Sequence, residues 1–102
     1  MNEELKKIGD HFGPVTQLCK QSEESKELTE ATDEFHQALV IEDDPEEIER
    51  KRQHMIEEMA DTWIMIQQNI RFHSSQEEFD SIVQAKLKRT LKRIDEGFYE
   101  GY

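Results

Sequence analysis

Helical periodicity runs through almost the whole chain and is interrupted at only three points. The 102 residues include two prolines and four glycines, and the interruptions fall at Gly13-Pro14, Asp44-Pro45 and Ser74-Ser75. Between them, apolar residues recur at spacings of three and four, which is typical of amphipathic helices. No alternating run of β-branched and aromatic residues predicts a strand. The sequence therefore predicts an all-α fold.

The interruptions predict about four helices in a single domain that covers residues 1–102. Pro14 suits the first turn of a helix, where its missing N–H has no partner to lose. Asp44 and Ser75 are each followed three residues later by a glutamate, which is the spacing of a capping box. The predicted helices cover residues 1–12, about 14–39, 45–72 and 76–95, with a short C-terminal tail. We expect them to form a helical bundle.

Composition and charge limit the partners of such a bundle. Hydrophobic residues make up 34% of the chain and charged residues 36%, which suits helices with narrow apolar stripes. We expect oligomerisation, as a homodimer or homotetramer, to complete the core. The net charge of −11 argues against a nucleic acid polymer or an anionic membrane as partner. The single cysteine, Cys19, and the lack of a long apolar run predict a cytoplasmic protein.

Two pairs of carboxylates stand on neighbouring predicted helices. Glu24 and Glu27 form the first pair and Glu58 and Asp61 the second, and residues three apart share a helix face. Apolar residues cover about half of the helix around the second pair: Met55, Ile56, Met59, Ala60, Trp63, Ile64, Ile66 and Ile70. We therefore expect the second pair to be partly enclosed. Enclosed carboxylates need a partner, which is either a basic group from another helix or a metal.

If the two helices face each other, four carboxylates converge on one volume. Such a site suits a hard cation with oxygen ligands, Mg²⁺ in particular, with Mn²⁺ as a substitute. One alternative is that the acidic runs are solvated helix faces. Another is a carboxylate di-iron or di-manganese centre, in which His54 and Glu58, four residues apart, share a metal.

The order of these motifs resembles a known family. The chain carries Phe12-Gly13, Gln17, Lys20, Glu23-Glu24-x-x-Glu27-Leu28 and then Glu57-Glu58-x-x-Asp61. This order is similar to that of the MazG-type all-α nucleoside triphosphate pyrophosphohydrolases, whose signature is an E-x-x-E pair followed by E-x-x-D on the next helix. The resemblance covers residues 12 to 99 and is closest to the small members found in phages and prophages.

The resemblance implies both a site and a reaction. It implies that Glu24, Glu27, Glu58 and Asp61 are the catalytic residues and bind Mg²⁺. It also implies that a ribo- or deoxyribonucleoside triphosphate is split between its α and β phosphates by a metal-activated water. The products are a nucleoside monophosphate and pyrophosphate, and the role is housekeeping of nucleotide pools.

Basic residues follow the second motif, as the family tends to have them. Lys86, Arg89 and Arg93 share a helix face through their spacing of three and four, and can hold the phosphate tail of the substrate. Lys20, one turn before Glu24, is a second candidate. No asparagine lies between Lys86 and Arg93, unlike the pattern often seen in the family, and the interval from Glu27 to Glu58 is long.

Other interpretations of the same residues remain open. The basic residues can be solvated groups that flank an apolar stripe, or can pair with the excess glutamates. If they pair with the carboxylates across helices, the protein is a non-catalytic oligomeric bundle that acts as an interaction or regulatory module.

Overall fold

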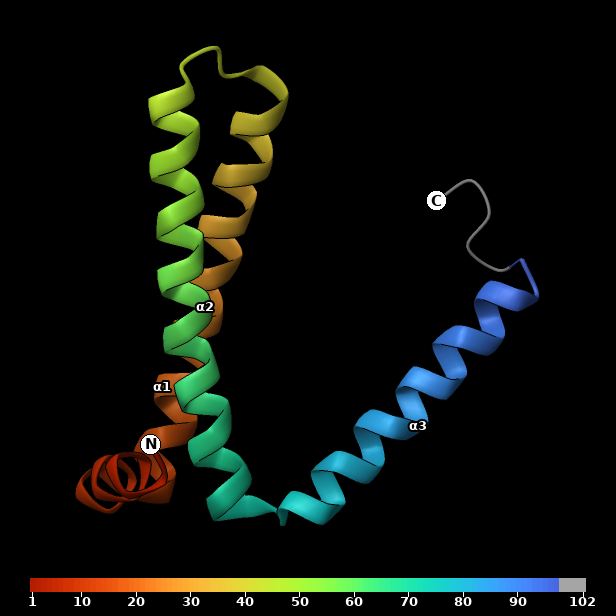
Figure 1. Ribbon diagram of the computed structural model, residues 1–102. Helices are drawn as coiled ribbons and strands as arrows, with labels where there is room; N and C mark the ends of the chain where they lie inside the picture. The colour runs from red at the N-terminus through yellow and green to blue at the C-terminus, as the bar shows by residue number, and fades with distance from the viewer. Residues whose placement is uncertain (98–102) are drawn as a thin grey trace.

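The computed structural model describes residues 1–97 and is helical throughout (Figure 1). Three helices follow one another: α1 (Asn2–Ile41), α2 (Pro45–His73) and α3 (Gln76–Asp95). No strand occurs within these 97 residues, so the predicted all-α fold is confirmed. The predicted C-terminal tail, apart from its first residues, lies outside the described part of the chain.

The predicted break at Gly13 is a kink within α1 rather than a gap between two helices, so three helices are counted where four were predicted. Gly13 has φ 82° and ψ 167°, which is not helical. A residue with a Cβ rarely adopts a positive φ, and glycine does so without steric cost. The residues before Gly13 therefore turn away from the direction of the rest of α1 (Figure 1).

The kink lays the first part of α1 against the second half of α2. The side-chain amide of Gln68 donates to the main-chain oxygen of Leu5 at 2.6 Å. Arg71 pairs with Asp10 at 3.1 Å. Gly9 is buried at this contact, where a Cβ would meet the side chains of Gln68 and Arg71. The small residue thus permits the close approach of the two segments.

The starts of α2 and α3 coincide with their predicted caps. Asp44 accepts a hydrogen bond from the main-chain N–H of Glu46 at 3.0 Å, and Pro45 follows in the first turn. Ser75 accepts from the main-chain N–H of Glu78 at 3.1 Å. These bonds satisfy N–H groups that a helix start leaves without partners.

The part of α1 that follows Gly13 forms an antiparallel hairpin with α2, and the residues that face each other recur every seven positions. On α1 these residues are Gln17, Glu24, Ala31 and Ala38, and on α2 they are Ile48, Met55, Thr62 and Asn69. All eight are buried or half-buried. A seven-residue repeat keeps one face of a helix against its partner along a supercoiled pair. Small alanines and apolar residues fill one end of this seam, and polar residues fill the other.

Two hydrogen bonds fix the register of the polar end of the seam. The hydroxyl of Thr62 donates to the main-chain oxygen of Glu24 at 3.2 Å. The side-chain amide of Asn69 donates to the main-chain oxygen of Gln17 at 3.0 Å and to the side chain of Gln21 at 2.8 Å. The Thr62–Glu24 and Asn69–Gln17 bonds fit the same antiparallel register. Sliding one helix along the other would break both bonds.

The apolar stripe of α2 is less enclosed than the sequence predicts. The α1 helix packs on the side of α2 that carries Thr62 and Asn69, and leaves Ile56, Met59 and Trp63 exposed by 39%, 51% and 44%. Cys19 is exposed as well. A single chain therefore does not cover this stripe, since α3 is not packed over it either.

The third helix leads away from the hairpin. It makes no contact with α1, and from the turn onward it diverges from α2 (Figure 1). The radius of gyration is 17.4 Å, whereas a compact domain of this length has about 13 Å. No helix among the described residues combines the length and apolar character that a membrane crossing requires.

Candidate metal centre

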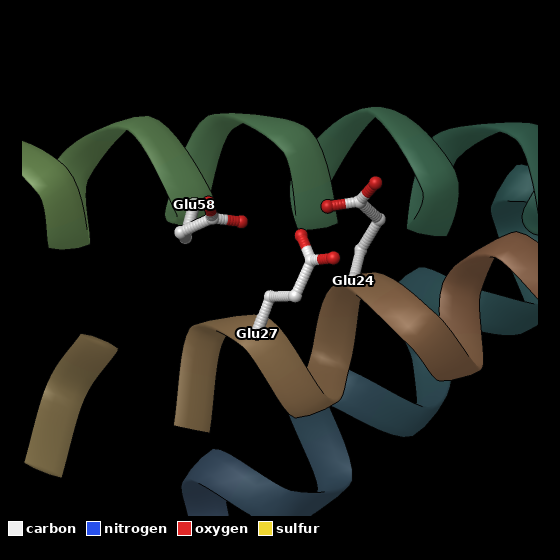
Figure 2. A group of neighbouring side chains, drawn as sticks. All are labelled: Glu24, Glu27 and Glu58. Carbon is white, nitrogen blue, oxygen red and sulfur yellow. The ribbon is translucent and has the colours of Figure 1, made fainter. Parts of the chain in front are cut away.

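Three of the four predicted carboxylates come together in the middle of the hairpin. Glu24 and Glu27 point from α1 toward Glu58 on α2 (Figure 2). One oxygen of each side chain lies within 4.8 Å of the others. The two residues of α1 are one helical turn apart, and the register that pairs Thr62 with Glu24 places Glu58 opposite them. We refer to Glu24, Glu27 and Glu58 as the carboxylate group.

The fourth predicted carboxylate, Asp61, lies beside this group and not within it. Its side chain is exposed, and it is absent from the set of oxygens within 4.8 Å. Its negative charge nevertheless contributes to raising the pKa of both Glu24 and Glu58. The structure therefore places Asp61 at the edge of the site, close enough to act on it electrostatically.

The carboxylate group is partly buried and poorly satisfied. The Glu58 side chain is only 12% exposed, and one oxygen of Glu24 and one of Glu58 are buried without a hydrogen-bond partner among the described residues. Burial, followed by the negative charges of Glu27 and Asp61, raises the pKa of Glu24 and of Glu58 above the usual value. Three ionised carboxylates in this setting repel one another, and either a bound proton or a bound cation relieves the repulsion.

His54 lies at the border of the group. Its Nε2 is 4.0 Å from an oxygen of Glu58, and its positive charge, when present, lowers the pKa of that carboxyl. The carboxylate group itself contains oxygen donors only. Hard divalent cations such as Mg²⁺ prefer oxygen donors, whereas di-iron sites of helical bundles use a histidine from each of two helices.

Thr62 is a positioning residue that the sequence patterns did not single out. It lies one turn after Glu58 on α2 and is 6% exposed. Its bond to the Glu24 main chain holds the two carboxylate-bearing segments together. The signal in the sequence is a seven-residue spacing. On α1 the residues Gln17, Glu24, Ala31 and Ala38 follow it, which places Glu24, the partner of Thr62, on the inner face of the hairpin.

The predicted phosphate-binding residues are not gathered at the carboxylate group of the same chain. Lys20 lies on α1 one turn before Glu24, and its ammonium group lies 4.7 Å from the centre of the Phe12 ring. Lys86 and Arg89 are exposed on α3, and Arg93 is half-buried there. Because α3 does not contact α1, these three residues belong to a separate part of the molecule.

Comparison of the chain with protein-family models, with curated proteins and with solved structures finds no match in any of the three. The geometry of the carboxylate group and the order of the sequence motifs therefore carry the functional proposal.

Proposed function

We propose that the chain is a Mg²⁺-dependent nucleoside triphosphate pyrophosphohydrolase of the MazG type. The observation that carries this proposal is the carboxylate group, in which three side chains from two helices bring oxygens within 4.8 Å of one another. The resemblance of the motif order supports the same assignment. The expected substrates are ribo- and deoxyribonucleoside triphosphates, and the products are the monophosphate and pyrophosphate.

The residues fit a divalent cation. The buried oxygens of Glu24 and Glu58 have no hydrogen-bond partner within the described structure, and coordination would satisfy both. Glu27 supplies a third oxygen on the exposed side. Mg²⁺ takes a few carboxylates and keeps its remaining positions for water and substrate phosphates. Asp61 then acts at the edge of the site, by charge or by holding a water.

A bound cation would also reduce the electrostatic repulsion between the acidic protein and its negatively charged substrate. The chain carries a net charge of −11, and a triphosphate is itself strongly negative. When bound, Mg²⁺ polarises the phosphoryl group and lowers the pKa of an attacking water. The carboxylates hold and orient this arrangement. Basic side chains, of which Lys86, Arg89, Arg93 and Lys20 are the candidates, bind the phosphate tail.

Pyrophosphate release tests the proposal directly. A panel of ribo- and deoxyribonucleoside triphosphates is incubated with the protein in Mg²⁺, in Mn²⁺ and in EDTA. We expect metal-dependent release by the wild-type chain and at least a hundredfold loss in Glu58→Gln, on the order of what one transition-state contact contributes. Glu30→Gln is the matched control, because Glu30 is exposed one turn beyond Glu27 and outside the carboxylate group. Full activity in Glu58→Gln contradicts the assignment.

A second candidate function is a non-catalytic oligomeric helical module that acts in interaction or regulation. The exposed apolar residues of α2 and α3 favour it, because large apolar surfaces on a free chain mark contact sites. Folded, oligomeric protein that releases no pyrophosphate from any triphosphate, and that Mg²⁺ does not stabilise, would support this candidate over the enzyme.

A further inference from the structure

Among the described residues, the buried polar side-chain atoms that lack a hydrogen-bond partner all lie at one end of the hairpin. They belong to five side chains: Gln17, Glu24, Glu58, Gln68 and Asn69. All five lie within residues 17–27 of α1 or 58–69 of α2, which together we call the polar end. The apolar end, residues 31–38 of α1 and 48–55 of α2, has no such atom in the described structure. A buried polar group without a partner destabilises the folded state, because it has given up its hydrogen bonds to water.

Gln17 is the extreme case. It is 0% exposed, and neither its Oε1 nor its Nε2 has a partner among the described residues. Gln68 is also 0% exposed, and its Oε1 lacks a partner there although its amide donates to Leu5. These two amides can regain hydrogen bonds with water only if α1 moves away from α2. Opening of the polar end therefore hydrates polar groups, whereas opening of the apolar end only exposes apolar ones.

The chain connects the two helices of the hairpin next to the apolar end (Figure 1). Residues 42–44 join α1 to α2, so Ala38 and Ile48 are close in sequence. Gln17 and Asn69, which meet at the polar end, are 52 residues apart. Contacts between residues far apart in sequence cost more chain entropy to form. The hairpin can therefore open from the polar end while the apolar end remains paired.

The first part of α1 adds little to the bonds of Thr62 and Asn69 that hold the polar end closed. Asp10 pairs with Arg71 at 3.1 Å, but the two side chains are 50% and 36% exposed. Ion pairs this exposed contribute little to stability. Gly9 is the only buried residue among residues 1–12. The first part of α1 therefore offers little resistance to opening.

Gly13 provides a joint for such a movement. Its φ of 82° is accessible to glycine. Beyond its chain neighbours, no side chain lies within 4 Å of the place where a Cβ would stand. Pro14 follows and keeps the helix from continuing through this point. Residues 14–27 can therefore move away from α2 while the first part of α1 keeps its own direction.

The carboxylate group bridges the two helices at the polar end. Glu24 and Glu27 reach into it from α1, and Glu58 from α2 (Figure 2). A divalent cation bound by all three would join the helices, and opening would separate its ligands. A ligand that binds only one form of a protein shifts the equilibrium toward that form by mass action. Cation binding and closure of the polar end are thereby coupled.

We propose that the polar end opens and closes as a unit while the apolar end stays paired, and that a divalent cation at the carboxylate group holds it closed. The statement about the cation rests on the metal site of the proposed function, whereas the opening does not. Opening moves Glu58 away from Glu24 and so releases the ion. Gln17 favours that step, because its amide is hydrated in the open form.

Hydrogen exchange of the main-chain amides tests the opening without reference to activity. A helical segment that has lost its packing is only marginally stable in water, so its amides exchange once the polar end opens. The full-length protein is measured in EDTA, under conditions in which exchange reports the equilibrium between closed and open forms. We expect protection factors at residues 21–27 and 58–69 to be at least about tenfold lower than at residues 31–38 and 48–55. Equal protection at both ends, as in a hairpin that unfolds all at once, overturns the proposal.

Replacing Gln17 by methionine tests the role of the buried amide, since methionine keeps the length of the side chain and removes both unpartnered atoms. We expect Gln17→Met to raise the protection factors of the polar end about tenfold in EDTA. Gln37→Met is the control, because Gln37 is exposed on the same helix, and it should change them by less than about twofold. Unchanged or lower protection in Gln17→Met means that the amide is hydrogen-bonded in the closed form, and overturns its role in opening.

Magnesium tests the coupling between the ion and closure. At one hundred times its dissociation constant, Mg²⁺ should raise the protection factors of the polar end about a hundredfold in the wild-type chain and in Glu30→Gln, and far less in Glu58→Gln. Unchanged protection in a protein whose unfolding midpoint Mg²⁺ raises means that the ion stays bound in the open form, and overturns the coupling.

Two further outcomes separate this proposal from the proposed function. A wild-type chain that Mg²⁺ neither protects nor stabilises refutes the metal site and the coupling with it, while the exchange measured in EDTA still decides the opening. Closure by Mg²⁺ in a chain that releases no pyrophosphate refutes the hydrolase and supports the coupling.

Discussion

The hydroxyl of Thr62 donates a hydrogen bond to the main-chain oxygen of Glu24 at 3.2 Å. The bond joins α2 to α1 one turn from Glu58, so the residues that carry the carboxylate group cannot slide apart without breaking it. Thr62 is 6% exposed, and a hydrogen bond in such a place is not readily replaced by water. The position of the carboxylates therefore depends on a residue that bears no charge.

Replacing Thr62 by valine tests this role, since valine keeps the shape of threonine and removes the hydroxyl. We expect Thr62→Val to lower the free energy of unfolding by about 1 kcal/mol and to weaken Mg²⁺ binding. Thermal unfolding and a Mg²⁺ titration measure the two effects. Thr29→Val is the control, because the Thr29 hydroxyl bonds only to Ser25 within α1, and it should change stability by less than about 0.5 kcal/mol.

Magnesium should stabilise the folded chain through the carboxylate group. At one hundred times its dissociation constant, a ligand that binds only the folded state adds about 2.7 kcal/mol. For a domain of this size the unfolding midpoint rises by about 10 °C or more. We expect this rise in the wild-type chain and in Glu30→Gln, and a much smaller one in Glu58→Gln. Equal rises in all three proteins would show that the ion acts elsewhere.

In EDTA, the pH dependence of the free energy of unfolding should show the raised pKa values of Glu24 and Glu58. Burial raises the pKa of Glu24 and Glu58 above the usual value of 4.5. Between 4.5 and the raised pKa values, the folded state therefore binds more protons than the unfolded state. The contribution of these two groups to stability is therefore most favourable at pH below 4.5, and declines as the pH rises through the raised pKa values.

Comparison with Glu58→Gln isolates that contribution. Basic partners lower the pKa values of Asp10, Glu47 and Glu49, so these groups make the folded state less stable as the pH falls. The wild-type chain and Glu58→Gln both contain these groups. Their contribution therefore cancels when the stability of one protein is subtracted from that of the other. Glu58→Gln should be the more stable protein at pH 7, by about 0.5 kcal/mol, and the difference should shrink toward pH 4. A difference that stays constant with pH contradicts the assignment of the raised pKa.

The positions of Glu27 and Asp61 predict unequal roles in metal binding. Glu27 belongs to the carboxylate group, whereas Asp61 lies at its edge. We expect Glu27→Gln to weaken Mg²⁺ binding more than Asp61→Asn does, and Asp61→Asn to act mainly through the loss of a nearby negative charge. Isothermal titration with Mg²⁺ measures both. Equal losses, or a larger loss in Asp61→Asn, would indicate that Asp61 is a direct ligand in the bound state.

The sequence by itself determined the helices and the candidate carboxylates. The spacing of apolar residues predicted the all-α fold, and Asp44, Pro45 and Ser75 marked the starts of α2 and α3, because capping depends on residues a few positions apart. The motif pairs likewise placed Glu24 with Glu27, and Glu58 with Asp61, on single helix faces. Each of these relationships is local, so one turn of helix is enough to establish it.

Only the tertiary structure decided which residues face one another. Local spacing does not fix the side on which α1 packs, and the structure sets α1 on the polar side of α2, along Thr62 and Asn69, rather than on the stripe that contains Trp63. That choice brings Glu58 to Glu24 and Glu27, leaves Asp61 at the edge, and leaves Ile56, Met59 and Trp63 of α2 exposed. The physical reason is that buried polar groups require partners in a defined register, whereas apolar packing alone permits several.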